Sequence, residues 1–183
     1  ASDVYKRQDT GLVQVSNTKA LENMPVKKDL EKELGFEIKI ANDADCLALS
    51  EAIDGAGKNY KTVFGIILGS GCGGGLIINK KIFVGANSFA GEWGHIPIGK
   101  PSSKNNIEEY ISGKGIERQY YTRFKKKLSA KEIFQNYRRK FDKERDIIKE
   151  FKKKLSRSLS LIINVIDPDA IVFGLSLIHI SEP

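Results

Sequence analysis

The hydrophobic pattern around the middle of the chain predicts a strand, a glycine-rich break and a second strand. Val63–Leu68 reads as a buried strand, Gly69–Gly75 contains five glycines, and Leu76–Ile78 and Ile82–Val84 resume the strand pattern. Glycine loses the most conformational freedom on folding, so this cluster indicates a backbone that passes close to a neighbour. Either a bare tight hairpin or a loop whose amides approach a phosphate satisfies the pattern.

Helices are predicted wherever apolar residues recur three and four positions apart. They are expected over Met24–Leu34, after a cap at Asn42 or Asp43, around Ile107–Ile111 after Asn105 or Asn106, over Ile116–Leu128, after a capping box of Ser129 and Glu132, and over Asp142–Ile166. Strands are also expected over Thr10–Val15, Phe36–Ile40 and Ala170–Phe173. This alternation of strands and helices predicts an α/β or α+β fold.

The pattern predicts which residues form the apolar side of two of these helices. The helix after Asn42 has Cys46, Leu47, Leu49 and Ile53 as its apolar members. The helix ending at Ile166 has one long stripe: Ile147, Ile148, Phe151, Leu155, Leu159, Ile162 and Ile163.

The two ends of the chain are related to each other through their possible codons. Residues 3–8 and residues 175–180 can be encoded by reverse-complementary DNA, as in an inverted repeat resembling a transposon-end adaptor. Residues 1–8 and 175–183 are therefore expected to be adaptor-derived and are set aside from the fold prediction. The segment 9–174 is then expected to be a fragment of a longer protein, with His95 as its single histidine.

The composition of the chain argues against nucleic acid and membranes as partners. The chain has 183 residues and a net charge of +7, with 23 Lys against seven Arg. Lysine runs such as Lys125–Lys127 and Lys152–Lys154 lie near acidic residues, which favours solvated helix faces and no nucleic-acid partner. No apolar run approaches the roughly 20 residues that cross a bilayer, so no membrane partner is expected. Two cysteines fit a reducing cytoplasm.

Polar residues at three positions are candidates for a functional site, because the hydrophobic pattern alone does not require them. Asn42 and Asp43 lie between a predicted strand and a helix, where ligands often bind, although helix caps look the same. Glu92 and His95 lie in a glycine-broken loop, which argues against a helical metal-binding pair. Glu108 lies in a predicted first helical turn, where a carboxylate is also favoured by the helix dipole.

Taken in order, five segments resemble the ROK family (repressors, open reading frames, kinases) of bacterial sugar kinases. They are Ala41–Cys46, Leu68–Gly75, Ala90–His95, Ile107–Gly113 and Asp167–Gly174. Ala41–Gly55 and Thr62–His95 look most similar to the manno(fructo)kinase branch.

The resemblance implies an actin-like, ribonuclease-H-like sugar-kinase fold, incomplete at both ends. Residues 9–60 would be the remainder of an N-terminal domain and residues 61–174 a truncated C-terminal domain. It also implies ATP-dependent phosphorylation of a hexose with Mg²⁺, fructose or mannose being favoured, and a cytoplasmic homodimer for the full-length protein.

Residue roles follow from the resemblance position by position. Asp43 would be the general base that accepts the proton of the sugar hydroxyl. The sugar hydroxyls would be bound by Asn42, Glu92, His95 and Glu108, and the phosphates by the loop residues Gly69, Ser70, Gly71 and Gly73.

The chain also departs from the family pattern. Most members have a cysteine triad that binds structural zinc with the residue matching His95, whereas the matching positions here are Gly99, Pro101 and Asn106, so zinc is expected to be absent. The N-terminal Asp-x-Gly-Gly-Thr phosphate loop is missing, so the fragment itself is expected to be inactive. Kinases of N-acetylhexosamine or glucose, and sugar-responsive repressors of the same family, stay open as alternatives; Asp43 favours a kinase.

Overall fold

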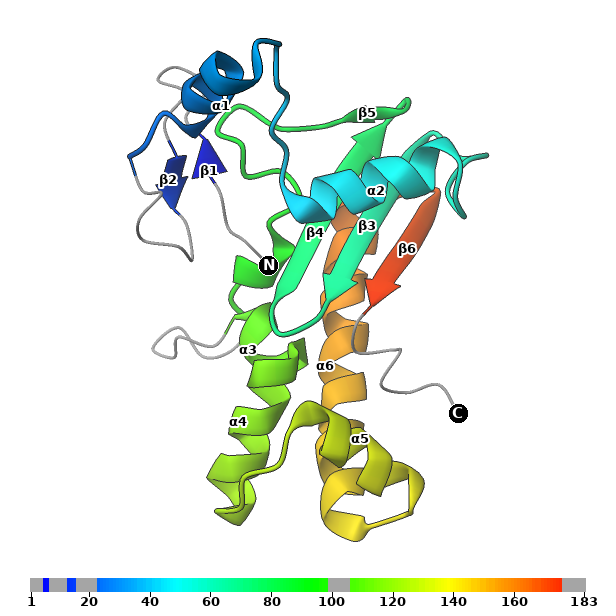
Figure 1. Cartoon of the computed structure of the whole chain (residues 1–183). Helices are drawn as coiled ribbons and strands as arrows, with labels where there is room; N and C mark the ends of the chain where they lie inside the picture. The colour runs from blue at the N-terminus through cyan, green and yellow to red at the C-terminus, as the bar shows by residue number, and fades with distance from the viewer. Residues whose placement is uncertain (1–4, 7–12, 16–22, 99–105, 176–183) are drawn as a thin grey trace.

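The computed structural model describes residues 5–6, 13–15, 23–98 and 106–175. Figure 1 shows a small sheet with helices on both faces and an arm of helices that extends away from it. The described elements begin with β1 (Tyr5–Lys6), β2 (Val13–Val15), α1 (Val26–Leu34), α2 (Asp43–Ile53), β3 (Thr62–Leu68), β4 (Cys72–Ile78) and β5 (Lys81–Ile82). They continue with the 3₁₀ turn η2 (Trp93–His95), α3 (Ile107–Ile111), α4 (Gly113–Phe124), α5 (Ala130–Arg138), α6 (Asp142–Ile166) and β6 (Ala170–Leu175).

The central sheet has the strand order β5-β4-β3-β6. Strands β3 and β4 form the predicted antiparallel hairpin, with Leu68 opposite Cys72, and β6 pairs with β3 in parallel. The parallel pairing needs a long crossover, which is supplied by the helical segment from α3 to α6. The α/β fold predicted from the alternating pattern is therefore confirmed.

Side chains of β3 alternate between two helical layers. Phe64 and Ile66 face a core to which α6 contributes Ile162, with Leu159 and Ile166 packed against it. Val63 belongs to the opposite core, which contains Ala48 and Ala52 of α2. The sheet is thus covered by α2 on one face and by the C-terminal half of α6 on the other (Figure 1).

The arm consists of α4, α5 and the N-terminal half of α6 (Figure 1). Its core contains Ile116 and Tyr120 of α4, Ile133 of α5, and Ile147 and Ile148 of α6. Helix α6 begins and ends where the sequence predicts, and the capping box of Ser129 and Glu132 is present. Helix α4 is displaced from its predicted bounds, because Ser112 caps it earlier and Lys125 ends it in a left-handed conformation.

Three local predictions are wrong. Residues 36–40 form no strand, since no strand among the described residues pairs with them, and Phe36 is exposed. The fully buried residues of helix α2 are alanines; of its predicted apolar members Leu49 packs only partly buried against the core and Ile53 is 57% exposed. In α6, Ile163 lies off the buried stripe and is 48% exposed, although Ile162 and Ile166 pack against the sheet core.

Parts of the two set-aside end segments lie in strands. Tyr5 and Lys6 form β1, which pairs with β2, and Leu175 ends β6 opposite Leu68. The predicted strand over Thr10–Val15 corresponds to β2 at Val13–Val15, and residues 10–12 lie outside the described residues. The adaptor origin of the end segments stays a prediction.

Candidate functional site

The start of α2 presents the first two candidate residues. Asn42 is the N-cap, and its Oδ1 accepts a hydrogen bond from the Ala44 N–H at 2.7 Å. Its Nδ2 donates to Glu92 Oε1 at 3.3 Å, so the amide both caps the helix and reaches across to another loop. Asp43 is exposed, and its Oδ1 accepts from the same Ala44 N–H at 2.9 Å. A helix N-terminus stabilises this carboxylate.

Glu92 and His95 lie on the glycine-broken loop that contains η2. Glu92 Oε2 lies 3.8 Å from His95 Nε2, with the Glu92 side chain 13% exposed and the His95 side chain 57% exposed. The buried Trp93 anchors this loop, because its Nε1 donates to the Gly73 carbonyl at 3.0 Å. Asn42, Glu92 and His95 therefore form one connected line of polar groups beside Asp43.

Glu108 approaches the same region from α3. Its Oε2 accepts a hydrogen bond from the Cys72 N–H at 2.9 Å, at the end of the β3–β4 loop. Burial raises the pKa of the Cys72 thiol, and the charges of Glu108 and Glu92 raise it further. Glu108 is thus attached to the first residue of β4, and the loop that contains Glu92 and His95 is attached to the next residue, Gly73, through Trp93.

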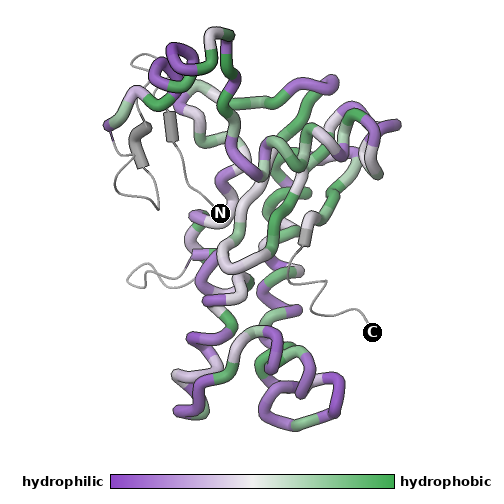
Figure 2. The backbone as a smooth tube through the Cα atoms, viewed as in Figure 1, coloured by the Kyte–Doolittle hydropathy of each residue, from purple (hydrophilic) through white to green (hydrophobic). Residues whose placement is uncertain are grey.

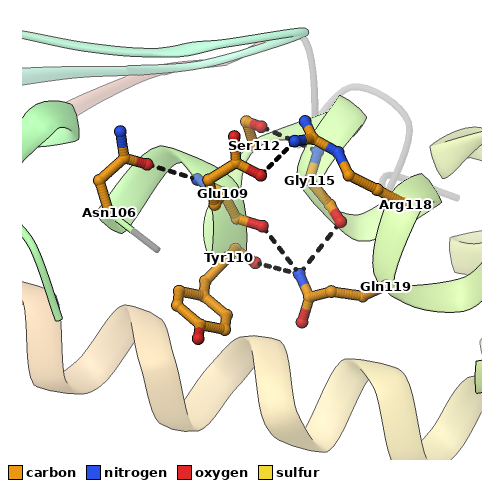
Figure 3. Close-up of polar contacts among 7 residues, drawn as sticks. All are labelled: Asn106, Glu109, Tyr110, Ser112, Gly115, Arg118 and Gln119. Atoms are coloured by element: carbon orange, nitrogen blue, oxygen red, sulfur yellow. Dashed lines mark hydrogen bonds and ion pairs between the residues drawn. The ribbon is translucent and has the colours of Figure 1, made fainter. Parts of the chain in front are cut away.

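The turn that holds α3 is fixed by a polar cluster shown in Figure 3. Asn106 caps α3 by accepting from the Glu109 N–H at 3.0 Å. Gln119 Nε2 donates to the carbonyls of Glu109, Tyr110 and Gly115, and Arg118 pairs with the Glu109 carboxylate. Because α3 has only five residues, these contacts from α4 hold the short helix that presents Glu108.

The glycine-rich segment divides into two parts. Gly69, Ser70 and Gly71 form the loop between β3 and β4, and the Gly113 N–H of α4 donates to the Gly69 carbonyl at 2.8 Å. Gly73 and Gly75 belong to β4 and face α2: a β-carbon on Gly75 would lie 2.7 Å from the Ala44 carbonyl oxygen. The strand glycines are packed closely against α2, and Gly73 stays a candidate phosphate contact together with the loop residues Gly69, Ser70 and Gly71.

Asp45 follows the candidate residues in the first turn of α2, was not predicted from the sequence, and has its Oδ1 against Gly75 of β4. Its Oδ1 is the buried side-chain oxygen without a hydrogen-bond partner in the described part of the chain. Burial raises the pKa of Asp45 to about 6, and the charges of Glu92 and Asp43 contribute. The sequence did contain a signal for it, because Asp45 is a third polar residue, after Asn42 and Asp43, at the start of the predicted helix.

The described residues offer little for binding a metal ion. Among the described residues, no group of three or more His, Cys, Asp or Glu side chains could hold a metal ion. Gly99 and Pro101, two of the positions that the family resemblance matches to zinc ligands, lie outside the described residues, so the absence of zinc stays a prediction. None of the described helices has the length and apolar character needed to cross a membrane.

Known proteins resemble the chain along most of its length. The family model described as "ROK family" matches residues 4–182. The chain belongs to the ROK family. It is 34% identical to an N-acetyl-D-glucosamine kinase of Histophilus somni, over 93% of the chain and 61% of that protein. The chain therefore spans about three fifths of the length of this curated ROK relative.

Solved structures of ROK proteins share the fold. A glucokinase from Streptomyces griseus, in complex with glucose and AMPPNP, matches with a TM-score of 0.78 and 24% identity, over 98% of this chain and 64% of that one. A ROK transcriptional regulator, a homologue of the E. coli MLC protein, matches with a TM-score of 0.83 and 20% identity, over 97% and 48%. The actin-like sugar-kinase fold is confirmed, and the chain is a partial copy of it.

Proposed function

We propose that the full-length protein expected from the sequence phosphorylates a hexose with ATP. The observation that carries the proposal is the line of polar groups from Asn42 through Glu92 to His95, beside the exposed carboxylate of Asp43. A sugar presents several hydroxyls, and a site of fixed donors and acceptors recognises them because an absent partner would leave buried polar groups unpaired.

Asp43 is proposed as the general base. A carboxylate within reach of the attacking hydroxyl can accept its proton while the phosphoryl group transfers. Asn42, Glu92, His95 and Glu108 are proposed to orient the sugar. Because Glu108 also accepts from the Cys72 N–H, the proposed sugar site and the loop at Gly69–Gly71 share one carboxylate.

ATP is proposed to bind with its phosphates near Gly69, Ser70, Gly71 and Gly73. Bound Mg²⁺ would supply electrostatic stabilisation of the transferring phosphoryl group, and in kinases it is held largely by substrate phosphates and water. A homodimer and a cytoplasmic location belong to the same proposal.

N-Acetylhexosamine is the substrate favoured by the curated relative, which is an N-acetyl-D-glucosamine kinase. Fructose or mannose is the second candidate, because the segments Ala41–Gly55 and Thr62–His95 resemble the manno(fructo)kinase branch. A panel of N-acetylglucosamine, glucose, mannose and fructose, assayed by ADP release from the full-length protein, distinguishes them.

The test of the general base is Asp43→Ala in the full-length protein. Loss of a positioned base is expected to lower kcat by about 10²–10⁴-fold while sugar binding, measured by calorimetry, is retained. Asp54→Ala, at the other end of α2, is the matched control and should leave kcat unchanged. Unchanged turnover in the Asp43 variant would contradict the assignment, and a sugar-responsive DNA-binding activity without turnover would favour the repressor.

A further inference from the structure

Charge is distributed unevenly between residues 113–157, which are the arm together with the middle of α6, and the rest of the molecule. Residues 113–157 contain seventeen Lys and Arg against six Asp and Glu, a net charge of +11, whereas the remaining residues have thirteen against seventeen, a net charge of −4. Hydrophilic residues follow most of the arm in Figure 2, interrupted by the hydrophobic positions packed between its helices. The excess positive charge therefore belongs to one part of the fold.

The acidic residues of the arm are already engaged. Three of them pair with single cations: Asp142 with Arg145, Asp146 with Arg123, and Glu150 with Lys154. The other three accept hydrogen bonds within the arm: Glu117 from the Ala130 N–H, Glu132 from Ser129, and Glu144 from the Tyr120 hydroxyl. The sequence predicted that the lysines lie on solvated helix faces near acidic residues. The six acidic residues of this segment are too few to pair with most of its seventeen basic residues.

A basic row of Lys149, Lys153 and Arg157 lies on the solvent face of α6. All three side chains are exposed and, within the described part of the chain, none makes an ion pair or a side-chain hydrogen bond. Residues four apart on a helix are neighbours about 6 Å apart along the axis, and like charges at this spacing destabilise it by about 0.2–0.5 kcal/mol per pair. The basic row therefore does not serve the stability of the helix.

We propose that the basic row binds the phosphodiester backbone of single-stranded nucleic acid. Regularly spaced cations suit regularly spaced phosphates, and binding would release condensed counterions. The row runs along the exposed face of α6, so a flexible strand can lie along the helix. Exposed Tyr121 and Phe141 in the same arm offer aromatic rings on which bases can stack. This inference is independent of the proposed kinase activity.

The test measures the fluorescence anisotropy of a labelled 20-nucleotide oligo(U) mixed with the chain between 50 and 300 mM salt. Binding is expected at low salt. The triple variant Lys149→Gln, Lys153→Gln and Arg157→Gln should bind at least tenfold more weakly, and the slope of log K against log salt should fall by about 2, since each lost phosphate contact contributes about 0.7. Glutamine keeps a good helix propensity, so the variant should stay folded.

The matched control removes three exposed lysines elsewhere, with Lys28→Gln, Lys32→Gln and Lys39→Gln. It has the same net charge as the first variant and should bind within twofold of the wild type. Equal loss in both variants would show a general charge effect and overturn the proposal. So would failure of the wild type to bind oligo(U) at 50 mM salt, or binding to vesicles of anionic lipid without binding to oligo(U).

Discussion

The layer where α2 covers the sheet and the arm of α4, α5 and α6 are packed in opposite ways. In the α2 layer the backbones approach closely: a β-carbon on Gly65 would lie 2.4 Å from Ala48 Cβ, and Ala44, Ala48 and Ala52 are fully buried. In the arm large side chains fill the space between the helices, as where Phe134 of α5 meets Phe151 of α6 edge to face with ring centroids 5.8 Å apart. The proposed site lies at the edge of the first region.

The two regions should respond differently to amino-acid substitutions. Where backbone meets backbone, an added methyl group has no flexible side chain to displace, so the layer as a whole must shift. Where large side chains meet, the interface depends instead on filled volume and on the pairing of its buried polar groups. The α2 layer should therefore fix the position of Asn42 and Asp43 more rigidly than the arm fixes its own surface.

The largest expected effect comes from adding one methyl group to the α2 layer. Gly65→Ala should lower the free energy of unfolding by about 3 kcal/mol, because its β-carbon would also lie 2.8 Å from Ala48 Cα. Urea denaturation followed by circular dichroism measures the loss. Gly73→Ala, whose β-carbon would meet only Ala44 Cβ at 3.2 Å, should cost clearly less.

Ala48→Gly provides the complementary control for Gly65→Ala. The double variant removes the methyl group that the new β-carbon would strike, so it should recover part of the lost stability in spite of the helix glycine. If Gly65→Ala alone left the protein as stable as the wild type, the close approach of α2 to β3 would be contradicted.

A smaller effect is expected from the polar contact inside the arm. The Tyr120 hydroxyl donates to Glu144 Oε1 at 2.8 Å, and both residues are buried; Asn136 Nδ2 donates to the same oxygen at 3.3 Å. Tyr120→Phe should lower the free energy of unfolding by about 2 kcal/mol, because a buried carboxylate loses its shorter hydrogen bond.

Tyr121→Phe is the matched control, since Tyr121 is the exposed neighbour on the same helix. Its free energy of unfolding should change by less than about 0.5 kcal/mol. Equal losses in the two phenylalanine variants would mean that the Tyr120–Glu144 contact does not stabilise the arm.

Local sequence signals predicted the parts of the fold that depend on few neighbours. The strand at β3 follows from an uninterrupted apolar run, and α6 follows from a stripe bounded by Asp142 and the Asp167–Asp169 turn. Asn42, Asn106 and Ser129 act as helix caps as their positions indicate. For the three caps the hydrogen-bond partner lies two or three residues along the chain.

The failures involve partners that are distant in sequence. Residues 36–40 alternate like a strand, but a strand needs a hydrogen-bonded neighbour, which the described chain does not place there. The face of α2 that lies against the glycines of β3 and β4 buries alanines, because the close approach leaves no room for a larger side chain. Helical periodicity alone cannot reveal which face this is. The unpaired oxygen of Asp45 has the same origin, because burial depends on what covers the helix.

The smallest expected effect returns to the α2 layer and concerns Asp45. Its pKa is raised to about 6 in the folded chain from an ordinary value of 3.8, so the folded state holds the proton more tightly than the unfolded state does. The resulting stability is fully present below pH 3.8 and is lost as the pH rises through about 6. At pH 7 the charged carboxylate therefore opposes folding. Asp45→Asn should stabilise the protein there by about 1 kcal/mol, a value reduced for the half-buried position of the side chain.

The measurement for Asp45→Asn is urea unfolding at several pH values between 3.5 and 7.5. The gain over the wild type should be near zero at the acidic end and should grow through the interval from pH 4 to pH 6. Asp142→Asn, at a 91% exposed carboxylate in the arm, is the control and should show no such growth. A gain for Asp45→Asn that does not vary with pH would mean that its charge is not the cause, and a parallel growth in both variants would remove the contrast between the α2 layer and the arm.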